Sequence, residues 1–348
     1  MQNIKIDIRD LTREELTQFF VENKKPKFRA IQVYEWLWKY RVLDFSKMTN
    51  LSKHDRSLLE NNFQINGIQV LKQSFSKDGT VKFLFEIDKN RVVEGVLIPQ
   101  LNRYTVCISS QVGCSLACTF CATGKLKLYR NLTAAEIYDQ VFLINKFCLT
   151  EFQSKITNIV YMGMGEPLLN IKNVLLSISH ITSKSGLYMS SKRITVSTAG
   201  ISKMIRKIAD LNPKFNLAIS LHSANNIKRT AIMEINKSND LESLSSALQY
   251  FFQKTKIKPT YEYVLLKGFN DTAQDAHDLI SFCKKIPSKV NLIEYNKVDD
   301  ISYEKSTTKA TTLFISILEK NKILVKFRKS RGEDIGAACG QLATELNK

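Results

Sequence analysis

The chain has 348 residues, 44% of them hydrophobic and 24% charged, a balance that is ordinary for a folded protein with room for one large domain and a smaller one. No apolar run approaches the roughly eighteen residues of a membrane-spanning helix, and the N-terminus lacks the apolar stretch of a secretory leader, so we expect a cytoplasmic protein with no membrane partner. The seven cysteines lack the spacing of a disulfide framework, which favours the same reducing compartment.

The net charge of +18 indicates a polyanionic partner, because Lys and Arg side chains neutralise phosphates. Basic residues gather at Lys125, Lys127 and Arg130, at Ser191–Arg193 and at Phe327–Arg331. The first of these groups directly follows a cysteine-rich loop. A compositional origin is the alternative, since the chain is also rich in the Lys, Ile and Asn residues that A/T-rich codons favour.

The first ninety-nine residues predict a small α+β accessory domain. Residues 1–60 are expected to be helical, because Thr12–Glu15 matches a capping box and Ala30–Tyr40 carries an apolar stripe at helical spacing. The pattern changes to strand-like alternation in a β unit over residues 61–99. Its two clearest strands are Val81–Ile87 and Arg91–Ile98. Lys77–Gly79 marks a turn between strands.

From residue 100 to 334, strand-like and helical segments alternate. The predicted strands are Tyr104–Ser109, Ile156–Met162, Arg193–Ser197, Phe215–Ser220, Thr260–Leu265, Lys289–Ile293 and Ile323–Arg328. The predicted helices are Thr133–Phe147, Ile171–Thr182, Ser202–Leu211, Leu241–Lys254, Asp271–Lys285 and Thr307–Lys320. This α/β alternation predicts a parallel sheet with right-handed crossovers. Six or seven units indicate a partial (βα)6-type barrel, open at the side to a macromolecule, with a C-terminal tail at 335–348.

Cys114, Cys118 and Cys121 form a C-x3-C-x2-C loop directly after the first strand of this barrel. A [4Fe–4S] cluster usually takes four thiolates, so three would leave one iron open to another ligand. The loop resembles that of the radical S-adenosylmethionine (SAM) superfamily, in which the open iron binds SAM and an electron from the cluster cleaves it. The alternatives are a structural zinc site and chance clustering. A zinc site needs four Cys or His ligands, and no histidine has a suitable spacing.

Polar or glycine-rich segments follow the other predicted strands, at the end where barrel active sites lie. Gly165 and Glu166, in Met162–Leu168, resemble the radical SAM element that binds the methionine amino group of SAM. We expect the remaining SAM contacts from residues at the ends of three later strands: Ser197, Ser220, Leu221, His222 and Asn296. Each of these taken singly is also compatible with a turn or a helix cap, and His222 with a hydrogen-bonded core histidine.

Segments spread over nearly the whole chain resemble the RlmN/Cfr family of radical SAM RNA methyltransferases. They are Lys27–Val33, Asp78–Thr80, Val92–Pro99, Ser109–Cys114, Met162–Leu168 and Arg331–Leu342. The resemblance implies a [4Fe–4S] cluster and SAM as cofactors, and an accessory domain that binds RNA. Its RlmN branch implies methylation at C2 of an adenosine in 23S rRNA, at the peptidyl-transferase centre, and in tRNA, 3′ of the anticodon. The loop after Asn296 departs from the family in reading Lys-Val where Pro is common.

The same resemblance implies roles for three further residues. Cys339 takes a methyl group from one SAM, and after radical activation the methylene carbon joins it to the RNA. Glu94 accepts the C2 proton, and Cys107 attacks the sulfur of Cys339 to release the product through a transient disulfide. Without the resemblance, Cys339 reads as a stray thiol, Cys107 as a buried small hydrophobe and Glu94 as a solvated strand carboxylate.

The family also implies an electron donor such as flavodoxin or ferredoxin, and we expect a monomer. Three competing functions remain open from the sequence. A Cfr-like enzyme would methylate C8 of the same rRNA adenosine. A radical SAM enzyme for a small molecule would leave both the basic surface and Cys339 without a role. A non-catalytic Fe–S or zinc protein that binds RNA would lack SAM cleavage.

Overall fold

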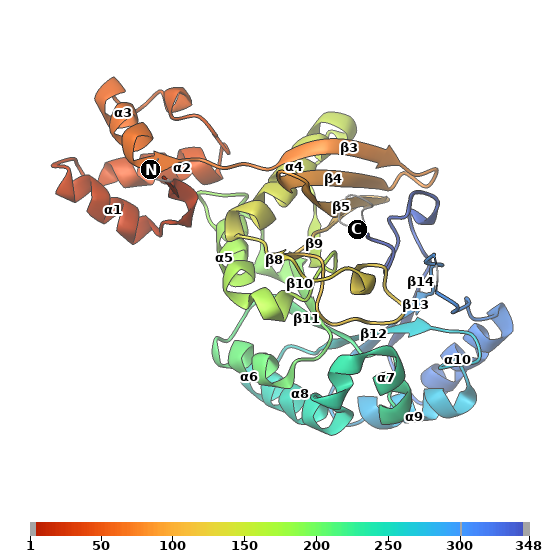
Figure 1. Cartoon of the computed structure of the whole chain (residues 1–348). Coiled ribbons are helices and arrows are strands. Elements are labelled where there is room, and N and C mark those ends of the chain that lie inside the picture. Colours follow the sequence, from red (N-terminus) through yellow and green to blue (C-terminus); the bar gives the residue numbers. More distant parts are fainter. Residues whose placement is uncertain (1–4, 300, 344–348) are drawn as a thin grey trace.

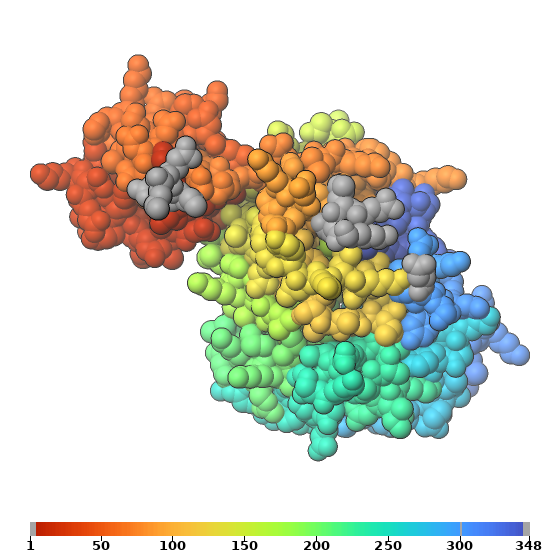
Figure 2. Space-filling model, viewed as in Figure 1, coloured from red at the N-terminus to blue at the C-terminus, as the bar shows by residue number. Residues whose placement is uncertain are grey.

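The computed structural model describes residues 5–299 and 301–343, so part of the expected tail, residues 344–348, lies outside it. An N-terminal group of three helices projects from the rest of the molecule (Figures 1 and 2). These helices are α1 (Arg13–Glu22), α2 (Phe28–Trp38) and α3 (Lys53–Asn62), beside a short parallel pair, β1 (Ile6–Asp7) and β2 (Phe63–Gln64). The predicted capping box begins α1, with Glu15 N donating to Thr12 Oγ1 at 3.1 Å and Thr12 N to the Glu15 carboxylate at 2.7 Å.

A ten-stranded sheet forms the rest of the framework, in the order β14-β13-β12-β11-β10-β9-β6-β5-β4-β3. Its parallel strands are β6 (Arg103–Cys107), β9 (Asn158–Tyr161), β10 (Ile194–Thr198), β11 (Asn216–Ser220), β12 (Thr260–Leu265), β13 (Lys289–Glu294) and β14 (Val325–Arg328). The predicted α/β barrel is thereby confirmed as an open, parallel-rich sheet with six βα units and a final strand.

The helices that follow these strands cover the outer face of the sheet (Figure 1). They are α4 (Ala134–Phe152), α5 (Ile171–Thr182), α6 (Ser202–Asp210), α7 (Asn226–Ile232), α8 (Leu241–Thr255), α9 (Ala273–Cys283) and α10 (Thr308–Lys320). Large apolar strand residues such as Tyr161, Leu217 and Tyr263 are fully buried on this side. The predicted helices agree with the observed ends within two residues, except that α4 continues to Phe152, five residues beyond the predicted end. The seven-residue helix α7 was not predicted. None of the helices in the described part of the chain is long and apolar enough to cross a bilayer.

Three antiparallel strands extend the sheet beyond β6: β3 (Gln69–Phe75), β4 (Val81–Asp88) and β5 (Arg91–Gln100). β5 pairs with β6 from Val96 opposite Cys107 to Gln100 opposite Arg103. The expected domain boundary after residue 99 therefore falls between two hydrogen-bonded strands. Residues 69–100 share one sheet with the barrel, whereas the helices before them form a separate body.

The N-terminal helical group is fastened to α4 and α5 by buried contacts. The Asp139 carboxylate on α4 is fully buried and pairs with Arg9 at 2.9 Å and Arg41 at 2.8 Å. Trp38 stacks on His180 of α5 with ring centroids 3.5 Å apart. Burial lowers the pKa of His180 to about 4, so this ring is neutral at physiological pH. A buried carboxylate between two guanidinium groups makes this junction specific in geometry.

Candidate active site

The inner face of the sheet carries a continuous set of polar side chains. In the ladder, Lys82 of β4 lies opposite Val96 of β5, which in turn lies opposite Cys107 of β6. Paired residues share a face and alternate residues return to it, so Lys82, Glu94 and Cys107 point to the same side. The register of the parallel strands places further polar residues on this inner face. They are Ser197, Ser220, Glu262, Asn291 and Arg328.

The cysteine loop packs across the mouth of the barrel after β6 and the short strand β7 (Gln111–Val112). Leu116, Cys118 and Phe120 of the loop pack against a small apolar cluster that includes Ile232, Met233 and Tyr295. The Thr119 amide donates to the carbonyl of Ile232 at 3.0 Å. Gly124 is needed here because a Cβ would lie 2.6 Å from the carbonyl oxygen of Cys118. The loop is thus held over the strand ends by both apolar packing and backbone bonds.

The three loop cysteines are free thiols whose charges would interact with one another. Burial raises the pKa of Cys114 to about 11, with a smaller contribution from Cys121. Desolvation likewise raises the pKa of Cys118 and of Cys121. Across residues 5–299 and 301–343, no three Cys, His, Asp or Glu side chains stand together as a formed metal-binding group. The donor chemistry nevertheless fits an iron–sulfur cluster, because three soft thiols share one loop and an attached iron would hold them deprotonated.

The glycine-rich turn after β9 fits tightly against the end of β6. Gly165 has φ +95°, and a Cβ there would lie 2.5 Å from the Gln111 side chain. Glu166 is 3% exposed, and its carboxylate accepts from Leu168 N at 2.9 Å and Ala199 N at 2.7 Å. Burial raises the pKa of Glu166, and these backbone donors oppose the increase. The turn thereby fixes a carboxylate within electrostatic reach of the cysteine loop.

The predicted SAM contacts at the ends of β10 and β11 are brought together, with different side-chain environments. Ser197 is 8% exposed on the inner face and lies opposite Ala218 of β11. Ser220 is half-buried and lies two positions further along β11, so it faces the same side. Leu221 is fully buried, and its amide donates to the Glu262 carbonyl at 3.0 Å. Ser197 and Ser220 therefore present hydroxyl groups on the inner face of neighbouring strands, at their carboxyl ends.

His222 is a buried, neutral histidine at the site. Its Nδ1 accepts from Val264 N at 3.0 Å, which assigns the ring proton to Nε2. Burial lowers the pKa of this imidazole to about 3, with a further contribution from the positive charge of Arg229. The ring meets Phe120 of the cysteine loop edge-on, with centroids 4.7 Å apart. His222 therefore joins the end of β11 to the cysteine loop.

The Cys339 segment lies over the same opening. Asn296, which follows β13, donates from Nδ2 to the Cys339 carbonyl at 3.2 Å, and Ala122 N donates to the Gly340 carbonyl at 2.7 Å. Asn296 Oδ1 is buried and has no hydrogen-bond partner within the described residues, so an acceptor remains for a ligand. The structure thus joins the predicted SAM contact Asn296 to the predicted methyl carrier Cys339.

Cys107 and Cys339 interact electrostatically across the mouth of the barrel. Burial raises the pKa of Cys107 to about 12, and the nearby Cys339 thiol adds to the increase. Water reaches Cys339, yet the surrounding protein raises the pKa of its thiol, first by desolvation and then through the charge of Glu262. Two thiols, one fixed on a strand and one on a surface segment, therefore lie within reach of each other's charge.

Glu94 is a buried carboxylate that pairs with Lys82. It is 2% exposed, and its Oε1 lies 3.1 Å from Lys82 Nζ. Burial raises the pKa of Glu94, whereas the charge of Lys82 and its hydrogen bond lower it. A carboxylate with a raised pKa in a cleft is suited to accept a proton.

Sequence reasoning missed several residues that shape this site. Arg229 of α7 is fully buried and donates to the carbonyls of Ala199 at 2.6 Å and Leu221 at 3.1 Å, so it ties the ends of β10 and β11 together. Glu262 accepts from Asn291 Nδ2 at 2.7 Å on the inner face. A signal was available for Glu262, because a charged residue interrupts an otherwise apolar strand. Arg229 stands in a short polar segment that gives no comparable signal.

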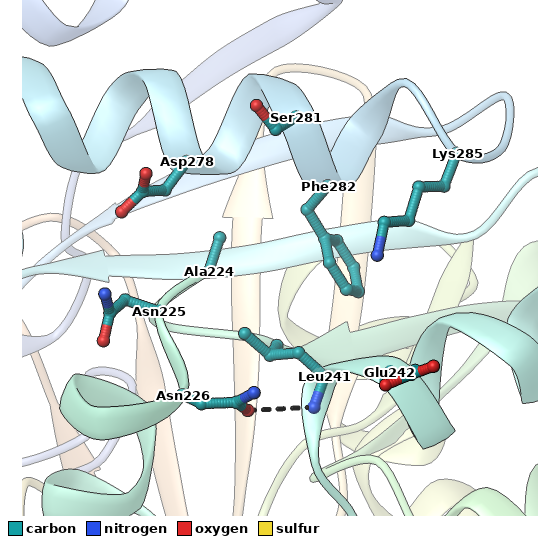
Figure 3. A pocket seen from close by; sticks show the side chains of 9 residues that line it. All are labelled: Ala224, Asn225, Asn226, Leu241, Glu242, Asp278, Ser281, Phe282 and Lys285. Carbon is teal, nitrogen blue, oxygen red and sulfur yellow. Dashed lines mark hydrogen bonds between the residues drawn. The ribbon is translucent and has the colours of Figure 1, made fainter.

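Two hollows on the described part of the molecule have different relations to these residues. One of about 350 Å³ separates α8 from α9 on the outer side, and none of the predicted site residues lines it (Figure 3). A bond inside it, from Leu241 N to Asn226 Oδ1 at 3.0 Å, fixes the start of α8. The other, of about 300 Å³, adjoins Cys118 on the flank of the loop. The convergence of reactive groups, rather than cavity size, therefore marks the candidate active site.

An open βα barrel with a three-cysteine loop after its first strand defines a radical SAM enzyme. Two family models match this chain, one over the barrel and one over the N-terminal helices. The Radical SAM superfamily model matches residues 108–282, and the model of the ribosomal RNA large subunit methyltransferase N-terminal domain matches residues 6–65. The solved structure of a radical SAM methyltransferase from Sphaerobacter thermophilus is 34% identical, with a TM-score of 0.90, and covers 97% of this chain and 99% of its own.

Similar curated proteins show which family of radical SAM enzymes this chain belongs to. A Cytophaga hutchinsonii protein is 52% identical over 97% of this chain and 92% of its own length. A Flavobacterium psychrophilum protein is also 52% identical, over 99% of both chains. Both carry the name "Probable dual-specificity RNA methyltransferase RlmN". The chain belongs to the RlmN family of radical SAM methyltransferases.

Proposed function

We propose that this enzyme methylates C2 of an adenosine in 23S rRNA and in tRNA, with Cys339 as the methyl carrier. The observation that supports the proposal most directly is that Glu94 and Cys107 share the inner face of the sheet and that Cys339 lies within reach of the charge of Cys107. A methyltransferase that moved a methyl group directly from SAM to RNA would need no such pair of thiols.

In this proposal Cys114, Cys118 and Cys121 would hold a [4Fe–4S] cluster. The cluster with SAM supplies a one-electron cleavage that creates an organic radical when both are bound. Glu166, Ser197, Ser220, Leu221, His222 and Asn296 would surround the SAM. Glu166 contributes negative charge and Asn296 a spare acceptor, and both suit the ammonium and hydroxyl groups of that molecule.

The residues of the chain then have separate tasks. The Cys339 thiolate takes the methyl group of one SAM and displaces S-adenosylhomocysteine, so that a carbon–sulfur bond forms at Cys339 and one breaks at the sulfonium. After the methylene carbon has joined the adenine, the adduct gives up one electron, for which a bound cluster would be the acceptor, and Glu94 accepts the C2 proton. The Cys107 thiolate then attacks the sulfur of Cys339, so that a disulfide forms and the sulfur–carbon bond breaks; its electron pair stays with the carbon, which takes a proton and becomes the methyl group of the product. The target base must leave its stack to reach this opening.

The proposal is tested by mass spectrometry of RNA incubated anaerobically with the enzyme, SAM and a low-potential reductant such as reduced flavodoxin or ferredoxin. Expected are 2-methyladenosine in both RNA classes and S-methylation at Cys339. Methylation at C8 would assign the Cfr-like reaction instead. An absence of 5′-deoxyadenosine together with an iron-free or zinc-bound protein would overturn the proposed radical mechanism.

A further inference from the structure

The segment that carries Cys339 depends on hydrogen bonds from other parts of the chain. Within the described residues, the regular structure of Arg331–Leu342 is one three-residue 3-10 turn, Glu333–Ile335. Gly332 and Gly336 bracket that turn with φ +67° and +62°. A segment with so little internal structure takes its position from what it touches, because its own backbone does not fix it.

Its strongest set of contacts is with the turn between β3 and β4. Ser76 Oγ donates to Asp334 Oδ1 at 2.6 Å, and Lys77 N donates to Asp334 Oδ2 at 3.2 Å. In the other direction, Gly332 N donates to Asp78 Oδ2 at 3.0 Å. Each partner thus supplies an aspartate that accepts a backbone amide of the other. Figure 1 shows the dark-blue C-terminal segment beside this hairpin.

The fit is close as well as polar. A Cβ on Gly332 would lie 2.8 Å from the Ala337 Cβ and 2.9 Å from Thr80 Cγ2, so the two backbones approach as only glycine permits. Four residues after Gly332, the Gly336 carbonyl accepts from Lys82 Nζ of β4 at 3.3 Å. Contacts at 332, 334 and 336 fix the path of the chain three residues before Cys339.

Beyond Cys339, the segment meets the cysteine loop and the loop after β13. Ala122 N and Asn296 Nδ2 donate to the Gly340 and Cys339 carbonyls, as described above. Gln341 Nε2 donates to the Lys297 carbonyl at 2.9 Å. These partners belong to the cysteine loop and to the loop that carries Asn296, whereas the β3–β4 turn carries none of the predicted SAM or cluster residues. The turn is therefore the anchor that bound cofactors would leave undisturbed.

We propose that the β3–β4 turn, through Ser76, Asp78 and Asp334, positions Cys339 over the barrel mouth. This rests on the proposed function, in which the Cys339 sulfur must meet SAM, the adenine and Cys107 in succession. Asp78 and Asp334 are both exposed, so water competes for their hydrogen bonds. The attachment of the Cys339 segment to the turn is therefore reversible. An anchor of this kind holds the thiol in place and still lets the segment shift between partners.

The test compares Asp334→Ala and Ser76→Ala with the unaltered protein, all purified anaerobically. Peptide mass spectrometry follows alkylation of unmethylated Cys339 by iodoacetamide. Ser76→Ala should alkylate roughly fivefold faster, the factor that corresponds to the loss of about one net hydrogen bond. Asp334→Ala should be at least as fast, because it also loses the bond from Lys77 N. The double variant should be no faster than Asp334→Ala, because that change alone already removes the bond from Ser76. With loaded enzyme, kcat should fall while KM for SAM is unchanged.

Glu333→Ala is the matched control, because it removes the same charge from the same 3-10 turn but pairs instead with Lys305 at 3.7 Å. It should alkylate at the unaltered rate. The proposal is overturned if Asp334→Ala and Ser76→Ala react like Glu333→Ala. Ser76→Ala keeps the test decisive should Asp334→Ala fail to fold. If the unaltered enzyme never methylates Cys339, the proposed function fails while the alkylation comparison still decides the role of the turn.

Discussion

Lys82 Nζ stands 3.1 Å from Glu94 Oε1 and 3.3 Å from the Gly336 carbonyl, so one ammonium group contacts both the predicted proton acceptor and the Cys339 segment. Burial favours the neutral form of Glu94, and Lys82 opposes this by favouring the carboxylate. The protonation state of Glu94 therefore depends on a residue that lies on a different strand.

Lys82→Met should move the acid side of the pH–rate profile upward. A raised carboxyl pKa means that Glu94 stops accepting protons as the pH falls through that value. Loss of an adjacent positive charge raises the pKa again, by about one unit or more. Methylation rates measured from pH 5 upward report the shift, and Lys82→Arg, which keeps the charge, is the control. An unmoved acid limb in Lys82→Met would remove Glu94 from the proton-accepting role.

Cys118→Ala should abolish SAM cleavage and the charge-transfer absorbance of an iron–sulfur cluster while the chain still folds. Two remaining thiols in the loop are too few to retain the cluster in a form that leaves one iron open. Cys283→Ala is the control, because that buried thiol lies on α9, away from the loop. Retention of the absorbance and of 5′-deoxyadenosine formation in Cys118→Ala would refute the cluster assignment.

The two mechanistic cysteines should fail in different ways. Cys339→Ala removes the methyl carrier, so neither S-methylcysteine nor an RNA adduct forms. Cys107→Ala permits both steps but lacks the thiol that releases the product, so RNA should remain covalently attached to Cys339. Nuclease-sensitive RNA on denatured protein distinguishes the two. Equal amounts in both variants, or none in either, would show that these roles are wrongly assigned.

Affinity for substrate RNA should fall steeply with salt. Each Lys or Arg that neutralises a phosphate contributes roughly 0.7–0.9 to the slope of log affinity against log salt concentration. Binding to a tRNA or an rRNA fragment, measured between low and physiological ionic strength, gives that slope. A flat dependence would indicate that the net charge of +18 reflects amino-acid usage rather than RNA recognition.

Asp139→Asn should destabilise the protein by about 3 kcal/mol, because it leaves two buried guanidinium groups without their counter-charge. Glu234→Gln removes a carboxylate from an exposed pair with Lys237, where both side chains are 65% exposed. That change should leave the stability nearly unchanged, because water screens an exposed ion pair. Thermal or urea unfolding of both variants checks the contrast. Comparable losses would mean that the N-terminal junction is not stabilised by Asp139.

The alternation of buried strands and amphipathic helices predicted most of the barrel, and Thr260–Leu265 coincides with β12. That success has a physical cause, because parallel strands covered by helices leave long apolar runs. Periodicity by itself does not say which strands pair. The joining of β5 to β6 was missed because a domain boundary was placed between them, although consecutive strands with a two-residue connection commonly pair. The same holds for the Cys339 segment, whose position depends on a turn more than 250 residues earlier.

Within the candidate site, motif resemblance located the cysteine loop and the glycine turn, but not the residues that support them. Arg229 and Lys82 look like ordinary surface charges in the sequence, because their partners are backbone carbonyls or a residue on another strand. Asn296 was predicted as a SAM contact, and the structure adds its bond to Cys339, which the sequence did not suggest. The catalytic roles themselves stay predictions until the variants are measured.

The ladder between β5 and β6 has a consequence for how this enzyme tolerates change. Glu94 and Cys107 face the same side only because Val96 lies opposite Cys107. A slip of one residue in that pairing would turn Glu94 toward α4 and away from the opening, with no change in composition. Insertions and deletions in β5 should therefore be eliminated by selection far more strictly than those in the surface loops, even where the altered strand still folds.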